Sequence, residues 1–195
     1  DMSNQPELAL PFESTRALLA KWREREAGKI ALIDLDQDGK SISWGELSIE
    51  ADKIAKFLSD RGIRPGDKIA VLEDNCLEAS DFFLAAAIGN FVRVPLYRRN
   101  SAEAHAHMIG HTDCRAIIVA AEYAHEVAQF KDTLDHLEHV IIRSDDYESW
   151  LAAQSDADPD IDIDIDDPHL IRHSGGTTGR SKGCLLYTSD AADEG

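Results

Sequence analysis

The sequence predicts an α/β fold with a largely parallel sheet flanked by helices. Strand-like and helix-like segments alternate along most of the 195 residues, and this order is typical of parallel strands joined by helical crossovers. The length suffices for one domain with a hydrophobic core, or for part of a larger domain. A composition that is 43% hydrophobic and 29% charged fits a globular protein.

The amino-terminal part predicts a helix, a strand and a second helix. Residues 14–26 have a helical pattern, and residues 31–36 have a strand pattern that leads into a turn. Ser43 and Glu46 then have the spacing of a capping box, because the serine oxygen can accept a backbone N–H while the glutamate reaches back. The helix ends at Gly62, before a Pro-Gly-Asp turn. Its apolar residues recur at helical spacing: Leu47, Ala51, Ile54, Ala55 and Leu58.

The middle of the chain predicts further strands and helices in alternation. Strand patterns lie at 68–72, 91–96, 116–120 and 140–143, and helix patterns at 76–89, 101–111, 123–137 and 146–154. The first two strands and the helix between them form a βαβ unit, which favours parallel pairing.

Residues 155–167 are rich in aspartate that alternates with isoleucine. This pattern predicts an exposed acidic linker or an edge strand. A calcium loop of the EF-hand type is excluded, because position six counted from Asp160 is Ile165 where glycine is required, and position twelve is Ile171 where glutamate is required.

Charge and cysteine content narrow the class of protein. A net charge of -17 argues against binding to nucleic acid, which needs a basic face. Three cysteines without a CxxC pair are typical of a reducing cytoplasm.

The first residues do not have the pattern of a signal peptide. The most apolar stretch, residues 82–92, is too short to cross a bilayer, so no transmembrane segment is expected.

One cluster of histidines could hold a metal ion. His105, His107, His111 and Cys114 lie close in sequence, and His107 and His111 share a helix face at a spacing that can bind zinc. No further ligand pair completes a known zinc signature. The alternative is an ordinary helix end at the protein surface.

The residues after the strand predicted at 169–173 have the composition of a phosphate-binding loop. Glycines let backbone amides approach an anion closely, three hydroxyls add short donors, and Lys182 adds a positive charge. These features suit a polyphosphate and its metal ion. The segment runs Ser174-Gly175-Gly176-Thr177-Thr178-Gly179-Arg180-Ser181-Lys182-Gly183.

The loop does not match the two commonest nucleotide motifs. A Walker A loop needs a glycine and a Gly-Lys pair with four residues between them, whereas Ser181 precedes Lys182 here, and the dinucleotide GxGxxG pattern is absent as well. A flexible Gly/Ser/Thr linker is the alternative. A plain linker rarely combines three glycines, three hydroxyls and a lysine directly behind a strand.

This loop resembles the signature TSGTTGxPKG of the adenylate-forming, or AMP-binding, enzymes, a family that includes acyl-CoA synthetases, luciferases and peptide-synthetase adenylation domains. Gly175 stands where serine is usual, and Ser181 where proline is usual. Weaker similarities to the family occur in the expected order along the chain. They lie at Ser43–Leu47, Arg64–Val71, Val94–Leu96 and Asp167–Pro168.

The resemblance implies a two-step reaction. A carboxylic acid attacks the α-phosphate of ATP to give an acyl-adenylate, and the thiol of coenzyme A then gives a thioester. Ser174 would contact Mg²⁺, and Lys182 would serve catalysis. An adenylation domain that loads a carrier protein and a non-catalytic nucleotide-binding module are the alternatives, and the oligomeric state and the acid cannot be inferred. The residues that the resemblance places at the β- and γ-phosphates are Ser174, Gly175, Gly176, Thr177, Thr178, Gly179 and Lys182.

The resemblance also divides the chain. Residues 1–183 are expected to be an incomplete amino-terminal adenylation domain, because the family's adenine, ribose and hinge motifs follow the phosphate loop. Residues 184–194 resemble an in-frame translation of the transposon-end adapter used to build sequencing libraries, with Gly195 as the start of an index. Residues 184–195 are therefore expected to be a non-native tail. A native helix of unusual sequence is the alternative.

Overall fold

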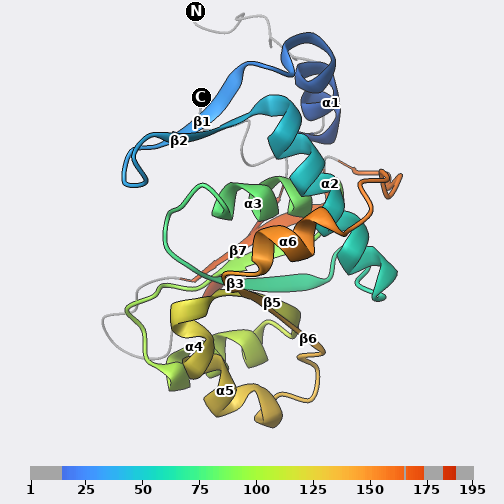
Figure 1. Ribbon diagram of the computed structural model, residues 1–195. Coiled ribbons are helices and arrows are strands. Elements are labelled where there is room, and N and C mark those ends of the chain that lie inside the picture. The colour runs from blue at the N-terminus through green and yellow to red at the C-terminus, as the bar shows by residue number, and fades with distance from the viewer. Residues whose placement is uncertain (1–14, 165, 174–181, 188–195) are drawn as a thin grey trace, which may run out of the picture.

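The computed structural model describes residues 15–164, 166–173 and 182–187, and Figure 1 shows how they are arranged. The described strands form a six-stranded sheet in the order β6-β5-β3-β4-β7-β8 and a separate two-stranded hairpin, β1-β2. Every pairing in the larger sheet is parallel except that of β7 with β8. The predicted α/β fold with a largely parallel sheet is therefore confirmed. The strands are β1 (Ile30–Asp34), β2 (Lys40–Ser43), β3 (Lys68–Leu72), β4 (Val92–Pro95), β5 (Cys114–Ala120), β6 (His139–Arg143), β7 (Pro168–His173) and β8 (Gly183–Tyr187).

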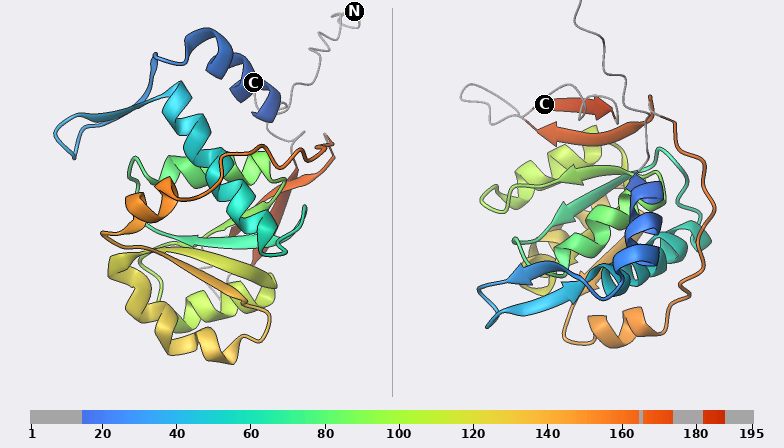
Figure 2. Two further views of the ribbon diagram at one scale, coloured as in Figure 1. Left: turned by 45° about the vertical axis from the view of Figure 1, so that its right-hand side comes forward. Right: turned by 90° about the horizontal axis from the view of Figure 1, so that it is seen from above.

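The helices cover the two faces of the large sheet. The chain passes from β3 to β4 in one direction and then returns past β3 to β5 and β6. Since parallel crossovers are almost always right-handed, this reversal puts the helix between β3 and β4 on one face and the helices that lead to β5 and β6 on the other. Figures 1 and 2 show α2, α3 and α6 on one face and α4 and α5 on the other. The α-helices are α1 (Thr15–Glu26), α2 (Trp44–Asp60), α3 (Ala79–Ile88), α4 (Ala102–His111), α5 (Ala124–Phe130) and α6 (Tyr147–Ala152).

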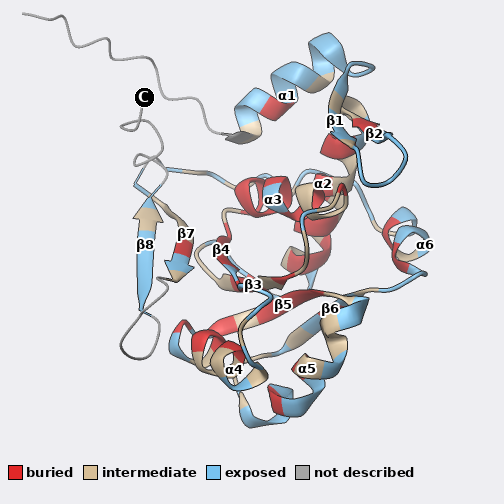
Figure 3. Ribbon diagram, turned by 90° about the vertical axis from the view of Figure 1, so that its left-hand side faces the viewer, coloured by how far each residue is buried: buried red, intermediate tan, exposed pale blue. Residues whose placement is uncertain are grey.

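Each face of the sheet has its own hydrophobic core. Ile69 of β3 belongs to the cluster under α2 and α3, whereas Ala70 and Leu72 belong to the cluster under α4 and α5. Successive side chains of a strand point to opposite faces, so a central parallel strand is apolar wherever both faces are covered. This requirement explains the unbroken apolar runs Ile69–Leu72 in β3 and Ala116–Ala120 in β5. Figure 3 shows the buried residues concentrated on the central strands and the helices that pack on them.

The local signals at the start of the fold are confirmed. The Ser43 side chain accepts from the amide of Glu46, and the Glu46 carboxylate accepts from the amide of Ser43, so the predicted capping box is present. In the Pro-Gly-Asp turn, Asp67 Oδ2 accepts from the Arg64 amide at 2.7 Å. Gly66 takes a positive φ of 82°, which glycine adopts without steric cost.

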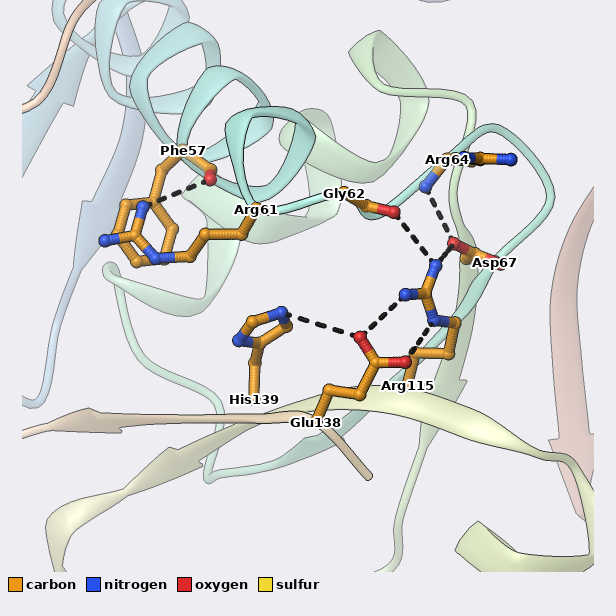
Figure 4. Close-up of polar contacts among 8 residues, drawn as sticks. All are labelled: Phe57, Arg61, Gly62, Arg64, Asp67, Arg115, Glu138 and His139. Carbon is orange, nitrogen blue, oxygen red and sulfur yellow. Dashed lines mark hydrogen bonds and ion pairs between the residues drawn. The ribbon is translucent and has the colours of Figure 1, made fainter. Parts of the chain in front are cut away.

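The amino edge of the sheet is tied together by Arg115, as Figure 4 shows. Its guanidinium donates to the Gly62 carbonyl at 2.9 Å, to Asp67 Oδ2 at 2.6 Å and to both carboxylate oxygens of Glu138 at 3.0 and 2.7 Å. The hydrogen bonds from Arg115 hold the pKa of Glu138 below its usual value. The paired charges of Arg115, Asp67 and Glu138 therefore hold this edge together.

Two predicted helix boundaries are wrong. The helix predicted at 123–137 ends at Phe130, because the Thr133 hydroxyl donates to the Phe130 carbonyl at 2.7 Å and the chain continues as a short 3-10 turn, Lys131–Thr133. Another 3-10 turn, Ala121–Tyr123, precedes it. The helix predicted at 76–89 begins only at Ala79.

The acidic segment is an exposed linker, and the predicted alternative of an edge strand is wrong over its described residues. Arg16 of α1 donates to Asp158 Oδ2 at 2.5 Å and to the Ile161 carbonyl at 2.7 Å, so α1 lies against this linker. The sequence patterns also missed β2, which pairs with β1 across the predicted turn. Of the helices described, none is long and apolar enough to span a membrane.

Candidate nucleotide-binding site

The predicted phosphate loop connects β7 to β8 at the carboxyl edge of the parallel strands. Residues 174–181 lie outside the described part of the chain, but both ends of the loop are described. His173 at the end of β7 pairs with Gly183 at the start of β8. Lys182 is exposed and stands directly before β8. The loop therefore leaves the sheet and returns to it at one point.

A glycine at position 183 allows this close return. A Cβ atom built on Gly183 would lie 2.9 Å from Cγ2 of Ile171, which is tighter than real side-chain contacts. Ile171 is itself buried in the core under α4 and α5. Because neither group can move freely, only glycine brings the end of the loop so close to β7.

The segments that follow β3 and β4 lie at the same edge of the sheet and are joined by Asp74. This carboxylate accepts from the Tyr123 hydroxyl at 3.1 Å and pairs with the Arg98 guanidinium. The contacts link three chain segments beside the crevice where the direction of the strand connections reverses. In open α/β sheets, ligands bind at such crevices.

A buried charged cluster fixes the carboxyl end of β6. The Arg143 guanidinium binds both carboxylate oxygens of Asp81 at 2.9 and 2.6 Å and Glu73 Oε2 at 2.7 Å. Burial alone would lower the pKa of Arg143, but the Asp81 carboxylate raises it above its usual value. Burial raises the pKa of Glu73 in spite of the neighbouring arginine. The cluster holds α3 and the segment after β3 in a fixed position.

The histidine cluster does not form a metal site, because the helix directs its members to different places. His105 is fully buried, with Nε2 3.0 Å from the Tyr97 carbonyl and Nδ1 3.2 Å from Glu126. His107 and His111 stack on each other. Cys114 is buried beside the Thr112 hydroxyl. No group of three His, Cys, Asp or Glu side chains within the described ranges could hold a metal ion.

The alternative of an ordinary surface helix end is also wrong for His105, which the helix turns into the core. His105 and Asp74 act through contacts between segments far apart in sequence. Neither residue belongs to a local motif, so a single sequence offered no signal for them.

Of the site residues predicted from the sequence, Lys182 alone lies in the described part of the chain. Ser174, Gly175, Gly176, Thr177, Thr178 and Gly179 lie outside the described residues. The structure places the two ends of their segment at the carboxyl edge. His173, which precedes them, has its pKa lowered by burial and by the nearby His111 and His107.

The fold and the position of the loop define an α/β domain of the kind that binds ligands beyond the carboxyl ends of its strands. The sequence profile of the AMP-binding enzymes matches residues 19–193. The chain belongs to this family, and the resemblance inferred from the loop is confirmed.

Two curated relatives agree with this family assignment, since both are acyl–CoA ligases by name. The chain is 31% identical over 165 residues to the uncharacterized acyl–CoA ligase YtcI of Bacillus subtilis (strain 168), a match that covers 80% of this chain and 31% of that protein. It is 25% identical over 170 residues to the 3-oxocholest-4-en-26-oate–CoA ligase of Rhodococcus rhodochrous, with 81% and 30% covered. The chain thus spans about 30% of the length of these relatives.

A solved structure agrees in fold. The inhibitor-bound amino-terminal domain of FACL13 from Mycobacterium tuberculosis superposes with a TM-score of 0.82 at 22% identity. The match covers 91% of this chain but 45% of that domain. The similarity supports the fold assignment alone.

Proposed function

We propose that the whole protein is an ATP-dependent carboxylate–CoA ligase that forms an acyl-adenylate and then a thioester. The observation that carries this proposal is the family's phosphate-loop signature, which lies between two paired strands at the carboxyl edge of the sheet. The curated relatives are acyl–CoA ligases by name, which supports the same activity. Its substrates would be a carboxylic acid, ATP and coenzyme A.

In the first step, a carboxylate oxygen attacks the α-phosphorus of ATP, and the bond to the bridging oxygen of pyrophosphate breaks. Negative charge grows on the departing pyrophosphate, so electrostatic stabilisation must carry this step. The amides of Gly175, Gly176 and Gly179 would donate to the β- and γ-phosphates, and the Thr177 and Thr178 hydroxyls would add donors. The Lys182 ammonium group would stay close to the negative charge of the phosphates as pyrophosphate leaves.

The pairing of His173 with Gly183 supports this role, because it fixes the base of the loop. A loop held at its base loses less conformational freedom on binding a ligand than a free linker does. The alternative of a flexible linker gives no reason for Gly183 and Ile171 to approach so closely.

Mg²⁺ is proposed at the Ser174 hydroxyl together with phosphate oxygens. Hydroxyl and phosphate oxygens are the hard ligands that Mg²⁺ prefers. The ion would neutralise part of the negative charge of the phosphates. Ser174 lies outside the described residues, so this assignment depends on the family resemblance alone.

A carrier protein in place of coenzyme A is the second candidate acceptor, and a non-catalytic nucleotide-binding module is the third possibility. We place the protein in the cytoplasm, because ATP and coenzyme A are available there and the two cysteines outside the expected tail, Cys76 and Cys114, are free.

The test requires the complete gene from the source organism. Pyrophosphate–ATP exchange is measured against a panel of aliphatic and aromatic acids, and thioester formation is then measured with coenzyme A. Acid-dependent exchange followed by acyl-CoA formation is expected. Exchange without acyl-CoA formation would favour a carrier protein as acceptor, and nucleotide binding without exchange would overturn the proposal.

A further inference from the structure

Arg93, on β4, is a partly buried arginine without an acidic partner in the described part of the chain. Its guanidinium lies 4.0 Å over the ring of Phe83, and its Nε is buried without a hydrogen-bond partner among the described residues. The described part of the chain places no carboxylate within ion-pair distance of it. Burial lowers the pKa of Arg93 to about 10.

The side chain lines a pocket of about 560 Å³ between α3, β4 and the β1-β2 hairpin. Most of the lining is apolar, and two apolar residues at its rim are exposed, Phe83 at 44% and Leu32 at 40%. Glu73 and Asp74 also line it, but they are paired with Arg143 and with Arg98 and Tyr123. As far as the described residues go, the pocket therefore offers an apolar surface and, at Arg93, a positive charge that no carboxylate pairs with.

A partly buried guanidinium without a counter-ion is unfavourable, since the desolvation of its buried Nε is not offset by a partner. An exposed apolar surface next to it is unfavourable as well. Both features disappear if an apolar segment with one carboxylate covers the pocket.

The family supplies a candidate for that segment. The chain covers 45% of the solved amino-terminal domain of FACL13, so a domain of this kind continues well beyond the matched part. β7, the strand that leads into the phosphate loop, lies beside the pocket, because it pairs with β4 at Leu170 and Arg93. β8, which follows the loop, lies one strand further out, at the edge of the sheet. His169 of β7 contacts the Phe83 ring edge-on, at 6.4 Å between ring centroids.

We propose that the surface formed by Leu32, Phe83 and Arg93 is covered, in the whole protein, by the part of the same domain that follows the phosphate loop, and that this part places a carboxylate against the Arg93 guanidinium. The inference depends on the length of the family's domain. It does not depend on the ligase activity, so either can fail without the other.

The first test compares Arg93→Met in the 195-residue chain and in the whole protein. In the chain the variant removes an uncompensated charge, so the melting temperature should rise by about 2–4 °C. In the whole protein it leaves a carboxylate unpaired, so the melting temperature should fall by about the same amount. Arg61→Met is the matched control, because Arg61 is exposed and also stacks on a phenylalanine, 3.5 Å from the Phe57 ring. A change of the same sign in both proteins would overturn the proposal.

The second test needs no variant. Hydroxyl-radical footprinting, read by mass spectrometry, should oxidise Phe83 readily in the 195-residue chain and several-fold more slowly in the whole protein. Ile142, which is 45% exposed on β6 at the other end of the sheet, is the reference residue. Equal oxidation of Phe83 in the two proteins would show that this surface stays uncovered and would refute the inference.

Discussion

Lys182 is the residue at which the phosphate loop rejoins the sheet, directly before Gly183. Hydrogen bonds to charged groups contribute roughly 1.5–3 kcal/mol, so Lys182→Ala in the whole protein should slow adenylation about 10- to 100-fold. Thr177→Ala and Thr178→Ala should cost less, since each removes a neutral hydroxyl. Pyrophosphate–ATP exchange measures all three variants.

The thioester step is the control for Lys182. When a synthetic acyl-adenylate is supplied, no triphosphate is bound, so Lys182→Ala should form the thioester at nearly the normal rate. An equal loss in both half-reactions would mean that the lysine supports the fold or domain closure and does not serve the phosphates.

Glu50 of α2 should make stability depend on pH. Burial and the nearby Asp81, Glu46, Glu148 and Glu78 carboxylates raise its pKa to about 7. The folded chain therefore holds a proton that the unfolded chain releases above about pH 4.5, and stability is lost as the pH rises from there through 7. Glu50→Gln should be more stable than the parent at pH 8, with an advantage that shrinks toward pH 5. Urea denaturation measures this.

Glu24→Gln is the matched control for Glu50, since Glu24 is exposed on α1. It should show no such trend between pH 5 and 8. A difference between Glu50→Gln and the parent that stays constant over this range would contradict the assignment of the proton to Glu50.

At the scale of elements, the Arg143 cluster joins the end of β6 to α3. Arg143→Met would leave the Asp81 and Glu73 carboxylates buried without a cation, so the free energy of unfolding should fall by about 3–5 kcal/mol at pH 8. The loss should shrink toward pH 5, because burial raises the pKa of Glu73 and so favours its neutral form as the pH falls. Chemical denaturation at the two pH values measures it. The exposed Arg99→Met is the control, and a loss equal to that of the control would contradict a structural role for the cluster.

The strand β8 raises the question of which residues are native. Its residues Cys184 and Leu185 are exposed, and the strand is paired at the sheet edge through its backbone. Backbone pairing is open to almost any sequence, so the pairing does not decide the origin of residues 184–195. Sequencing the source locus should give other codons after Gly183. Genomic codons for Leu185, Leu186 and Tyr187 would prove the adapter hypothesis wrong.

At the scale of the whole molecule, the 195-residue chain alone should have no ligase activity. It spans about 30% of the length of its relatives, and the reaction needs the complete set of groups in place. Pyrophosphate–ATP exchange with the same panel of acids measures this, with the whole protein as the positive control. Acid-dependent exchange by the short chain would refute the prediction.

Local signals predicted much of this molecule. The capping box of Ser43 and Glu46, the Pro-Gly-Asp turn and the apolar runs of β3 and β5 each depend on contacts within a few residues or on burial on both faces of a sheet. Those contacts are fixed by the order of residues, so the α/β class and most elements followed from the sequence. The segment from Ser174 to Lys182 identified the family, because a signature motif also depends only on the order of neighbouring residues.

The tertiary structure alone decided the rest. The sheet has β3 between β4 and β5, His105 is buried against Tyr97 and Glu126, and Arg143 lies against Asp81, 62 residues away. These outcomes depend on which distant segments meet, and that choice is set by the burial of apolar surface and the pairing of charges over the whole chain, which no short stretch of sequence contains.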